Sequence, residues 1–265
     1  MRAMIFAAGL GTRLKPITDT MPKALVPVCG QPLLYHVISK LVAAGYDDLV
    51  VNVHHFPDQI IHYLHSHDFG ARIAVSDERD FLRETGGGIK YARPLLLNEA
   101  IPGCPSTSSG TTGNDGNEPF LVHNVDIVSN LDLEWLREQF REGALVTLVA
   151  SERKTQRYFL FDEDYRLKGW TNIATGEVRS PFPDIDPDQC RKLAFAGIHL
   201  MSPAIFDAFD RYGFGDRFSI VDFYLRACAD YPIYAAVPPD FQLVDVGKFD
   251  ALPEAEATCA TILND

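Results

Sequence analysis

The sequence predicts an α/β fold in which helices cover both faces of a mixed, mostly parallel sheet, with a small substrate subdomain. Short apolar runs alternate with amphipathic stretches in the first half of the chain, which is the pattern of successive strand and helix units. The apolar runs are nearly continuous, as in strands that are buried on both faces. The chain has 265 residues, 46% of them hydrophobic, which is enough for one large core.

The first half, residues 1–150, contains most of this alternation. Gly45 follows the first amphipathic stretch, in the position where glycine commonly ends a helix, and Pro57 occupies a position that suits the first turn of the next helix. The predicted elements of this half are strands at 3–7, 49–53, 72–75, 120–122 and 145–150, and helices at 33–44, 57–65 and 133–141.

Residues 98–118 differ from their surroundings because they are rich in Gly, Ser, Thr, Pro and Asn and nearly lack large apolar side chains. Such a segment buries too little surface to offset its ordering entropy, so we predict a flexible surface insertion within a single domain, 1–265. The second half, 151–265, has shorter apolar runs separated by turn residues. Its predicted elements are strands at 158–161, 167–170, 193–201 and 233–237, and helices at 203–209, 221–229 and 249–262.

The charge and the cysteines narrow the function classes. The 36 acidic and 24 basic residues give a formal net charge of −12, which disfavours binding to nucleic acid or to an anionic membrane surface. The sequence has no apolar run long enough to span a membrane, and its first apolar run is too short for a secretory signal. The five cysteines are odd in number and widely spaced, so we expect neither a disulfide framework nor a zinc site. This use of cysteine is typical of a protein in a reducing cytoplasm.

A glycine-containing loop, Ala7-Ala8-Gly9-Leu10-Gly11-Thr12-Arg13, follows the first predicted strand. Glycines allow backbone N–H groups to approach an anion, and Arg13 and the later Lys23 carry charge that can neutralise phosphates. Leu14 replaces the third glycine of the dinucleotide-binding fingerprint, and the G-K-[ST] of a P-loop is absent. The loop therefore indicates a polyphosphate site other than these two, although by itself it is equally compatible with a plain glycine turn.

Two aspartates follow apolar runs: Asp126 comes after the predicted strand 120–122, and Asp245 comes after the run 241–244. The binding crevice of an open α/β sheet lies at the carboxyl ends of its strands. A few carboxylates, completed by phosphate oxygens and water, are the ligands that Mg²⁺ prefers. Taken alone, Asp126 is better explained by an Asx turn, and Asp245 by a cap on the last helix.

Two further segments contain residues that could bind a ligand or a metal. Glu84-Thr85-Gly86-Gly87-Gly88 precedes a helix that we expect to begin at Ile89, and its alternative interpretation is a flexible three-glycine turn. Asp184-Ile185-Asp186 matches the D-x-D motif of metal-dependent glycosyltransferases. It lies between two prolines in a predicted loop rather than at a strand end, which argues against that class.

Together these segments resemble the sugar nucleotidyltransferases, which join a nucleoside triphosphate and a sugar 1-phosphate into a nucleotide sugar and pyrophosphate. The matching segments occur in the family's order over nearly the whole chain: 7–23, 26–33, 84–89, 124–126, 195–198 and 245–247. Val125 is a departure, because the family usually has glycine before the metal-binding aspartate. The resemblance implies a Rossmann-like sheet of the nucleotide-diphospho-sugar transferase type.

The resemblance also implies a role for individual residues, with 1–150 as the nucleotide-binding half and 151–265 as the sugar-phosphate-binding half. Arg13 and Lys23 would be catalytic, on the β/γ- and α-phosphates, and Asp126 and Asp245 would hold Mg²⁺. Gly197 would border the sugar. The nucleotide would contact Ala8, Gly9, Leu10, Gly11, Thr12, Glu84, Thr85, Gly86, Gly87 and Asn124. The cation for the sugar 1-phosphate would be one of Arg157, Lys168 and Lys192.

The resemblance leaves several substrates open. The short length and the 84–88 segment look most like the family's uridylyltransferases of N-acetylmuramate 1-phosphate, which serve cell-wall recycling. Mannose 1-phosphate guanylyltransferases and glucose 1-phosphate thymidylyltransferases are near alternatives. A non-catalytic regulatory relative would typically lack Arg13, Lys23, Asp126 or Asp245, and all four are present. We therefore expect a cytoplasmic, Mg²⁺-dependent enzyme that binds a nucleoside triphosphate and a sugar 1-phosphate, with its oligomeric state open.

Overall fold

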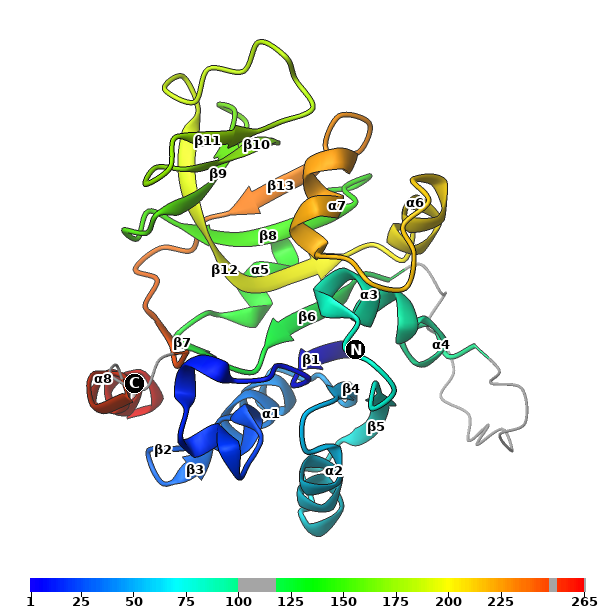
Figure 1. Ribbon diagram of the computed structural model, residues 1–265, viewed down its shortest axis with the longest axis vertical. Coiled ribbons are helices and arrows are strands. Elements are labelled where there is room, and N and C mark those ends of the chain that lie inside the picture. The colour runs from blue at the N-terminus through cyan, green and yellow to red at the C-terminus, as the bar shows by residue number, and fades with distance from the viewer. Residues whose placement is uncertain (100–117, 248–251, 265) are drawn as a thin grey trace.

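A computed structural model describes residues 1–99, 118–247 and 252–264, so the predicted insertion at 98–118 lies outside them except at its ends. Within these residues the centre is a ten-stranded mixed sheet (Figure 1). Its parallel part has the order β6-β1-β4-β5. These strands are β6 (Phe120–Asn124), β1 (Arg2–Phe6), β4 (Asp48–Val53) and β5 (Arg72–Asp77). The predicted α/β class, with a mixed sheet whose central strands are parallel, is confirmed.

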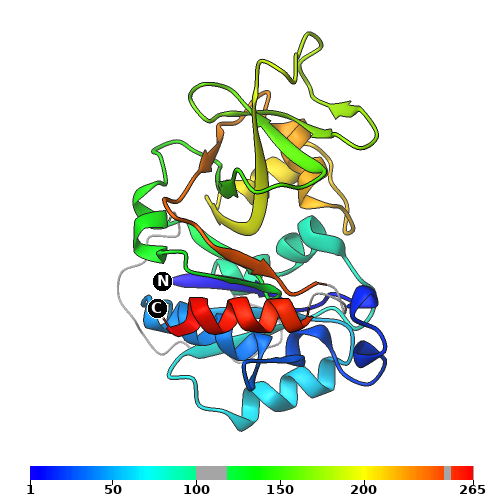
Figure 2. The same cartoon turned by 90° about the vertical axis from the view of Figure 1, so that its left-hand side faces the viewer.

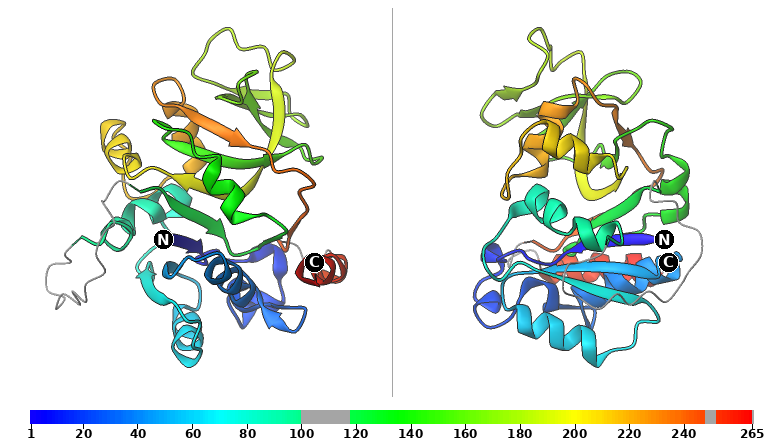
Figure 3. Two further views of the ribbon diagram at one scale, coloured as in Figure 1. Left: turned by 180° about the vertical axis from the view of Figure 1, so that it is seen from behind. Right: turned by 90° about the vertical axis from the view of Figure 1, so that its right-hand side faces the viewer.

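The second half of the chain extends this sheet with strands that pair antiparallel, except that β13 pairs parallel with β8. The long strand β12 (Arg191–Met201) pairs with β6 through its last residues and with β9 through its first. The other added strands are β8 (Val146–Ser151), β9 (Arg157–Phe161), β10 (Leu167–Asn172), β11 (Glu177–Arg179) and β13 (Ile233–Ala236). The sheet therefore joins both halves of the chain, and β9–β11 lie at the opposite end of the molecule from α2 (Figure 3).

The core has two parts because alternate residues of the central strands point to opposite faces of the sheet. In β1, Ala3 and Ile5 belong to one cluster, and Met4 belongs to the other. The helices that supply the first cluster are α1 (Leu33–Ala43), α2 (Pro57–Ser66), α5 (Leu133–Glu138) and α8 (Leu252–Asn264). The second takes side chains from α3 (Glu84–Tyr91), α4 (Arg93–Leu96), α6 (Ile205–Arg211) and α7 (Ile220–Ala227). No helix in the described ranges is long and apolar enough to cross a membrane.

Two features of the fold differ from the sequence prediction. The helix expected to begin at Ile89 begins at Glu84, so the predicted start is wrong, and so is the alternative interpretation of the glycines as a flexible turn. Its first turn is held from outside, because the N–H groups of Gly86 and Gly87 donate to the carbonyl of Phe218 at 2.9 and 3.2 Å. A short antiparallel pair, β7 (Ile127–Ser129) and β14 (Leu243–Asp245), was not predicted as paired strands, and α8 lies beside it (Figure 2).

Two buried histidines predict how acid affects stability. Burial lowers the pKa of His123 on β6 from 6.5 to about 4 and that of His199 on β12 from 6.5 to about 3. Both are therefore neutral in the fold, whereas in the unfolded chain they bind protons once the pH falls below their ordinary pKa. We expect the free energy of unfolding to decrease by about 1.4 kcal/mol per pH unit for each histidine, from about pH 6 towards pH 4.

Urea denaturation at about pH 7 and about pH 5 measures this dependence. Other groups titrate in the same range, so the contribution of His199 is isolated by comparing the wild type with a double variant, His199→Phe/Tyr224→Phe. The second substitution removes the phenol that lies 2.7 Å from His199 Nδ1 and would otherwise lose its partner. The double variant should lose less stability on acidification, and an equal loss would contradict the prediction.

Candidate active site

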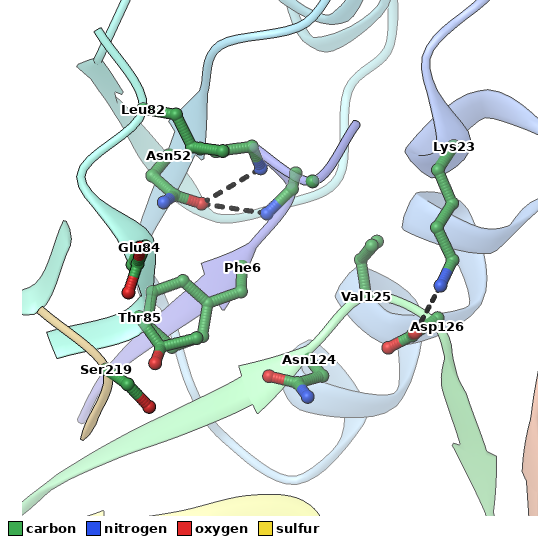
Figure 4. A pocket seen from close by; sticks show the side chains of 13 residues that line it. Phe6, Lys23, Asn52, Leu82, Glu84, Thr85, Asn124, Val125, Asp126 and Ser219 are labelled. Atoms are coloured by element: carbon green, nitrogen blue, oxygen red, sulfur yellow. Dashed lines mark hydrogen bonds and ion pairs between the residues drawn. The ribbon is translucent and has the colours of Figure 1, made fainter. Parts of the chain in front are cut away.

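A cavity of about 400 Å³ opens at the carboxyl ends of β1 and β6. Lys23 and Asp126 lie at one end, and Glu84, Thr85 and Ser219 lie at the other (Figure 4). The remaining lining residues are Phe6, Ala7, Ala8, Gly9, Asn52, Leu82, Asn124 and Val125. The structure thus brings the two predicted nucleotide-binding segments, the glycine loop and the 84–88 region, to one cavity.

A buried polar chain that the sequence analysis missed fixes the start of the glycine loop. Asn52 Oδ1 on β4 accepts hydrogen bonds from the N–H groups of Ala7 and Ala8 at 2.8 and 3.3 Å. Asn52 Nδ2 donates to Glu78 Oε1 at 2.7 Å, and Glu78 Oε2 accepts from Arg83 N at 3.2 Å. The chain connects the ends of three parallel strands to the start of α3. The loop is therefore positioned before any ligand binds.

The glycines of the loop have different functions. Gly11 has φ +63, and a Cβ there would lie 2.7 Å from Thr18 Cγ2, so both the turn and the close packing require glycine. Nothing lies within 4 Å of a Cβ built on Gly9, which lines the cavity and leaves it open. Leu10 and Thr12 are exposed and do not line the cavity in this conformation.

Lys23 and Asp126 contact each other directly. Lys23 lies in a 3-10 turn (Lys23–Leu25) and is 9% exposed, and its ammonium forms an ion pair with Asp126 Oδ2. Asp126 occupies the turn between β6 and β7. The positive charge of Lys23 and the negative charge of Asp126 therefore neutralise each other at this end of the cavity.

Asp245 lies next to Asp126 because β14 pairs with β7 and Val246 N donates to the Asp126 carbonyl at 2.9 Å. The pKa of Asp245 is raised, first because surrounding protein removes part of its water and second because of the Asp126 charge. Lys23, Arg13 and Arg153 act in the opposite direction on that pKa. Gly247 leaves space for the side chains of Asp245 and Arg13, since a Cβ there would lie 2.5 Å from Asp245 Oδ1 and 3.1 Å from Arg13 Nη2. Four predicted residues thus form one charged cluster.

Gly197 lies at an irregularity in β12, where the register with β8 shifts between Phe195 and His199. Its φ is +74, and a Cβ would lie 2.6 Å from Asn124 Nδ2. Asn124 lines the cavity, whereas Gly197 does not. In this structure Gly197 therefore makes room for the Asn124 side chain.

The three cations expected near a sugar phosphate do not line the cavity. Lys168 pairs with Asp162 at 3.2 Å, Lys192 pairs with Asp188 at 2.6 Å, and Arg157 is exposed at the start of β9. Arg153, which the sequence analysis did not consider, donates to the Phe195 carbonyl at 3.0 Å and lowers the pKa of Asp245. The one sequence signal that could have found it is its position two residues after the strand β8.

Gly86 and Gly87 are buried and lie against the segment before α7. A Cβ on Gly86 would lie 2.2 Å from the Phe218 ring, and one on Gly87 would lie 2.3 Å from the backbone oxygen of Asp216. Neither residue lines the cavity, whereas their neighbours Glu84 and Thr85 do. These two glycines therefore permit close packing of α3 on residues 216–219.

This packing gives a stability prediction. Gly87→Ala is expected to lower the free energy of unfolding by about 1–3 kcal/mol, because the new methyl group meets backbone that cannot rotate away. Gly215→Ala is the matched control, since nothing lies within 4 Å of a Cβ at that position. Urea denaturation of both variants provides the measurement. If Gly87→Ala were as stable as Gly215→Ala, this account of the packing would be wrong.

Comparison with known proteins matches the chain to one family and to two relatives, one of similar length and one longer. The nucleotidyl transferase family model matches residues 2–159. The N-acetylmuramate alpha-1-phosphate uridylyltransferase of Caulobacter vibrioides is 32% identical, over 97% of this chain and 96% of that protein. The mannose-1-phosphate guanyltransferase of Eremothecium gossypii is 28% identical over 78% of this chain, but the match spans only 51% of that longer protein.

The fold has counterparts among solved structures. The crystal structure of HddC from Yersinia pseudotuberculosis superposes with a TM-score of 0.71, covering 97% of this chain and 98% of that one. The two sequences are 20% identical, so the likeness concerns the fold. It extends through both halves of the chain, beyond the residues that the family model matches.

Proposed function

This chain belongs to the nucleotidyl transferase family and is a sugar-phosphate nucleotidyltransferase, and from that premise we propose that it transfers a uridylyl group from UTP to N-acetylmuramate 1-phosphate. The observation that carries the proposal is the cluster of Arg13, Lys23, Asp126 and Asp245. Lys23 and Asp126 of this cluster line one end of a cavity whose other end is uncharged except for Glu84. The clustered end suits a triphosphate, and the far end suits a nucleobase. The choice of uracil and N-acetylmuramate is supported by the relative in Caulobacter vibrioides.

In the proposed reaction, an oxygen of the sugar 1-phosphate forms a bond to the α-phosphorus of the nucleotide. The bond from that phosphorus to the bridging oxygen of the β-phosphate breaks, and pyrophosphate leaves with the electron pair. Lys23 stabilises the charge at the α-phosphate, and Arg13 binds the leaving phosphates. Lys23 faces Asp126 in this structure, so at least one of the three N–H donors of the ammonium has to turn to the α-phosphate when the nucleotide binds.

Asp126 and Asp245 are the residues that would hold Mg²⁺. Two adjacent carboxylates, one with a raised pKa, form a site that a divalent cation would stabilise. Among the described residues no group of three or more His, Cys, Asp or Glu side chains could hold a metal by itself. Phosphate oxygens and water would complete the coordination, which fits Mg²⁺. When bound, the ion would neutralise phosphate charge and orient the triphosphate.

We assign the sugar 1-phosphate to Arg153 in preference to Arg157, Lys168 and Lys192. Arg153 acts on the same charged cluster, whereas the lysines are paired with Asp162 and Asp188.

The proposal also places the enzyme in the cytoplasm, in cell-wall recycling. The four described cysteines are free thiols, which suits a reducing compartment.

A substrate panel tests the proposed function. The kcat/KM values for UTP, dTTP, GTP, ATP and CTP are measured with N-acetylmuramate 1-phosphate, glucose 1-phosphate and mannose 1-phosphate, following pyrophosphate release. We expect UTP with N-acetylmuramate 1-phosphate to be preferred, with dTTP as the nearest competitor because one methyl group is worth only about 1–3 kcal/mol. A preference for GTP with mannose 1-phosphate would overturn the substrate assignment. Absence of turnover with every pair would instead support a non-catalytic, nucleotide-sugar-binding protein.

A further inference from the structure

Part of the wall at the base end of the cavity comes from the second half of the chain. Residues 216–220 lie along the start of α3, with Phe218 N donating to the Arg83 carbonyl at 3.3 Å and Arg217 Nε donating to Glu84 Oε1 at 3.0 Å. These contacts bring Ser219 beside Thr85 and Glu84 at the cavity (Figure 4). Ser219 is therefore fixed in position by the same packing that requires Gly86 and Gly87.

The hydroxyl groups of this wall are already used as acceptors. Ser219 Oγ accepts a hydrogen bond from Val221 N at 3.2 Å as the cap of α7, and Thr85 Oγ1 accepts one from Ile220 N at 2.9 Å. A hydroxyl group also carries one proton to donate. Within the described part of the chain, neither proton has an acceptor in the protein. Both residues line the cavity, so a ligand that fills the base end and excludes water would have to supply acceptors for their hydroxyl groups.

Uracil and cytosine differ in the groups that such a wall distinguishes. At position 4 uracil has a carbonyl acceptor where cytosine has an amino donor, and at N3 uracil has a donor where cytosine has an acceptor. A hydroxyl proton suits the uracil carbonyl, and the Glu84 carboxylate, which only accepts when ionised, suits the uracil N3–H. Cytosine would leave the hydroxyl proton without an acceptor and place its N3 lone pair near a carboxylate.

We propose that Ser219 is a specificity-determining residue that donates its hydroxyl proton to a carbonyl oxygen on the edge of the base, so that the site accepts keto-pyrimidines and discriminates against cytosine. This inference rests on the proposed function, because it assumes that the base occupies the Glu84–Ser219 end of the cavity. Ser219 touches the base in this assignment and lies far from the reacting phosphorus. Its effect is therefore on the choice of nucleotide.

The UTP-to-CTP ratio tests this role, because the two nucleotides have the same ribose and triphosphate. Ser219→Asp is the decisive variant, since aspartate also caps a helix but has no proton to donate at neutral pH. We expect it to reduce the UTP/CTP ratio of kcat/KM about tenfold while Tm stays near the wild-type value. The added charge weakens both triphosphates alike and cancels in the ratio. Ser219→Ala should reduce the ratio and also lower Tm, whereas Ser219→Thr should keep the ratio high.

Calorimetric titration with UTP and CTP, in the absence of sugar phosphate, separates this inference from the proposed function. Asp132→Ser exchanges the cap residue of α5, away from the cavity, and should leave the UTP/CTP ratio unchanged. A wild-type protein that binds CTP as tightly as UTP, or a ratio that Ser219→Asp does not change, would overturn the role of Ser219. If UTP binding responds to Ser219→Asp but no sugar 1-phosphate is turned over, the proposed function fails and the assignment of Ser219 is supported.

Discussion

Asp126→Asn is expected to lower kcat by about three orders of magnitude while the fold remains intact. The substitution keeps the size of the side chain but removes the negative charge that, with Asp245, would hold a divalent cation against the triphosphate. The hydrogen bond from Val246 N to the backbone oxygen of residue 126 does not depend on the side chain, so the β7–β14 connection should persist. The variant should therefore unfold at a temperature close to that of the wild type.

Pyrophosphate release at saturating UTP and N-acetylmuramate 1-phosphate, across a series of Mg²⁺ concentrations, measures the effect. Asp184→Asn is the matched control, because it makes the same chemical change in the D-x-D segment, which does not line the cavity. We expect the control to retain full activity. Wild-type turnover in Asp126→Asn, or loss of turnover in Asp184→Asn, would show that the metal-binding carboxylate has been assigned to the wrong segment.

The parts of this site that the sequence predicted are those that follow strands along the chain. The glycine loop comes directly after β1 and Asp126 directly after β6, and carboxyl ends of neighbouring parallel strands meet at one edge of the sheet. The grouping of Asp245 with Asp126 depends on the pairing of β14 with β7, which joins segments more than a hundred residues apart. No local pattern encodes such a pairing, so the grouping of Asp245 with Asp126 came only from the family resemblance.

The residues that the sequence analysis missed act through tertiary contacts. Asn52 lies within an apolar run, and its part in positioning the loop depends on Glu78 from the next strand. The start of α3 was misjudged because three glycines have low helix propensity, whereas contacts with Phe218 hold the first turn in place. Ser219 reaches the cavity through the same packing. In each case the signal is a neighbour that is distant in sequence.

Lys23→Met is expected to lower kcat by about two to three orders of magnitude, because a positive charge placed at the α-phosphate acts most strongly when the attacking and leaving oxygens share the phosphorus. Methionine keeps most of the length and apolar contacts of the lysine side chain, which is 9% exposed. Lys15→Met, in the same loop, is the matched control. Lys15 is exposed and, within the described ranges, pairs only with Asp19, so its loss should change kcat little.

Combining Lys23→Met with Asp126→Asn tests whether the two side chains act as one unit. They form an ion pair in this structure, and both are assigned to the same phosphates, so their effects on kcat should not multiply. We expect the double variant to be no more than about tenfold slower than the slower single variant. If Lys23→Met kept wild-type turnover, the α-phosphate could not be its target. If the two losses multiplied in full, the two side chains would act independently, and the inference that they act as one unit would be wrong.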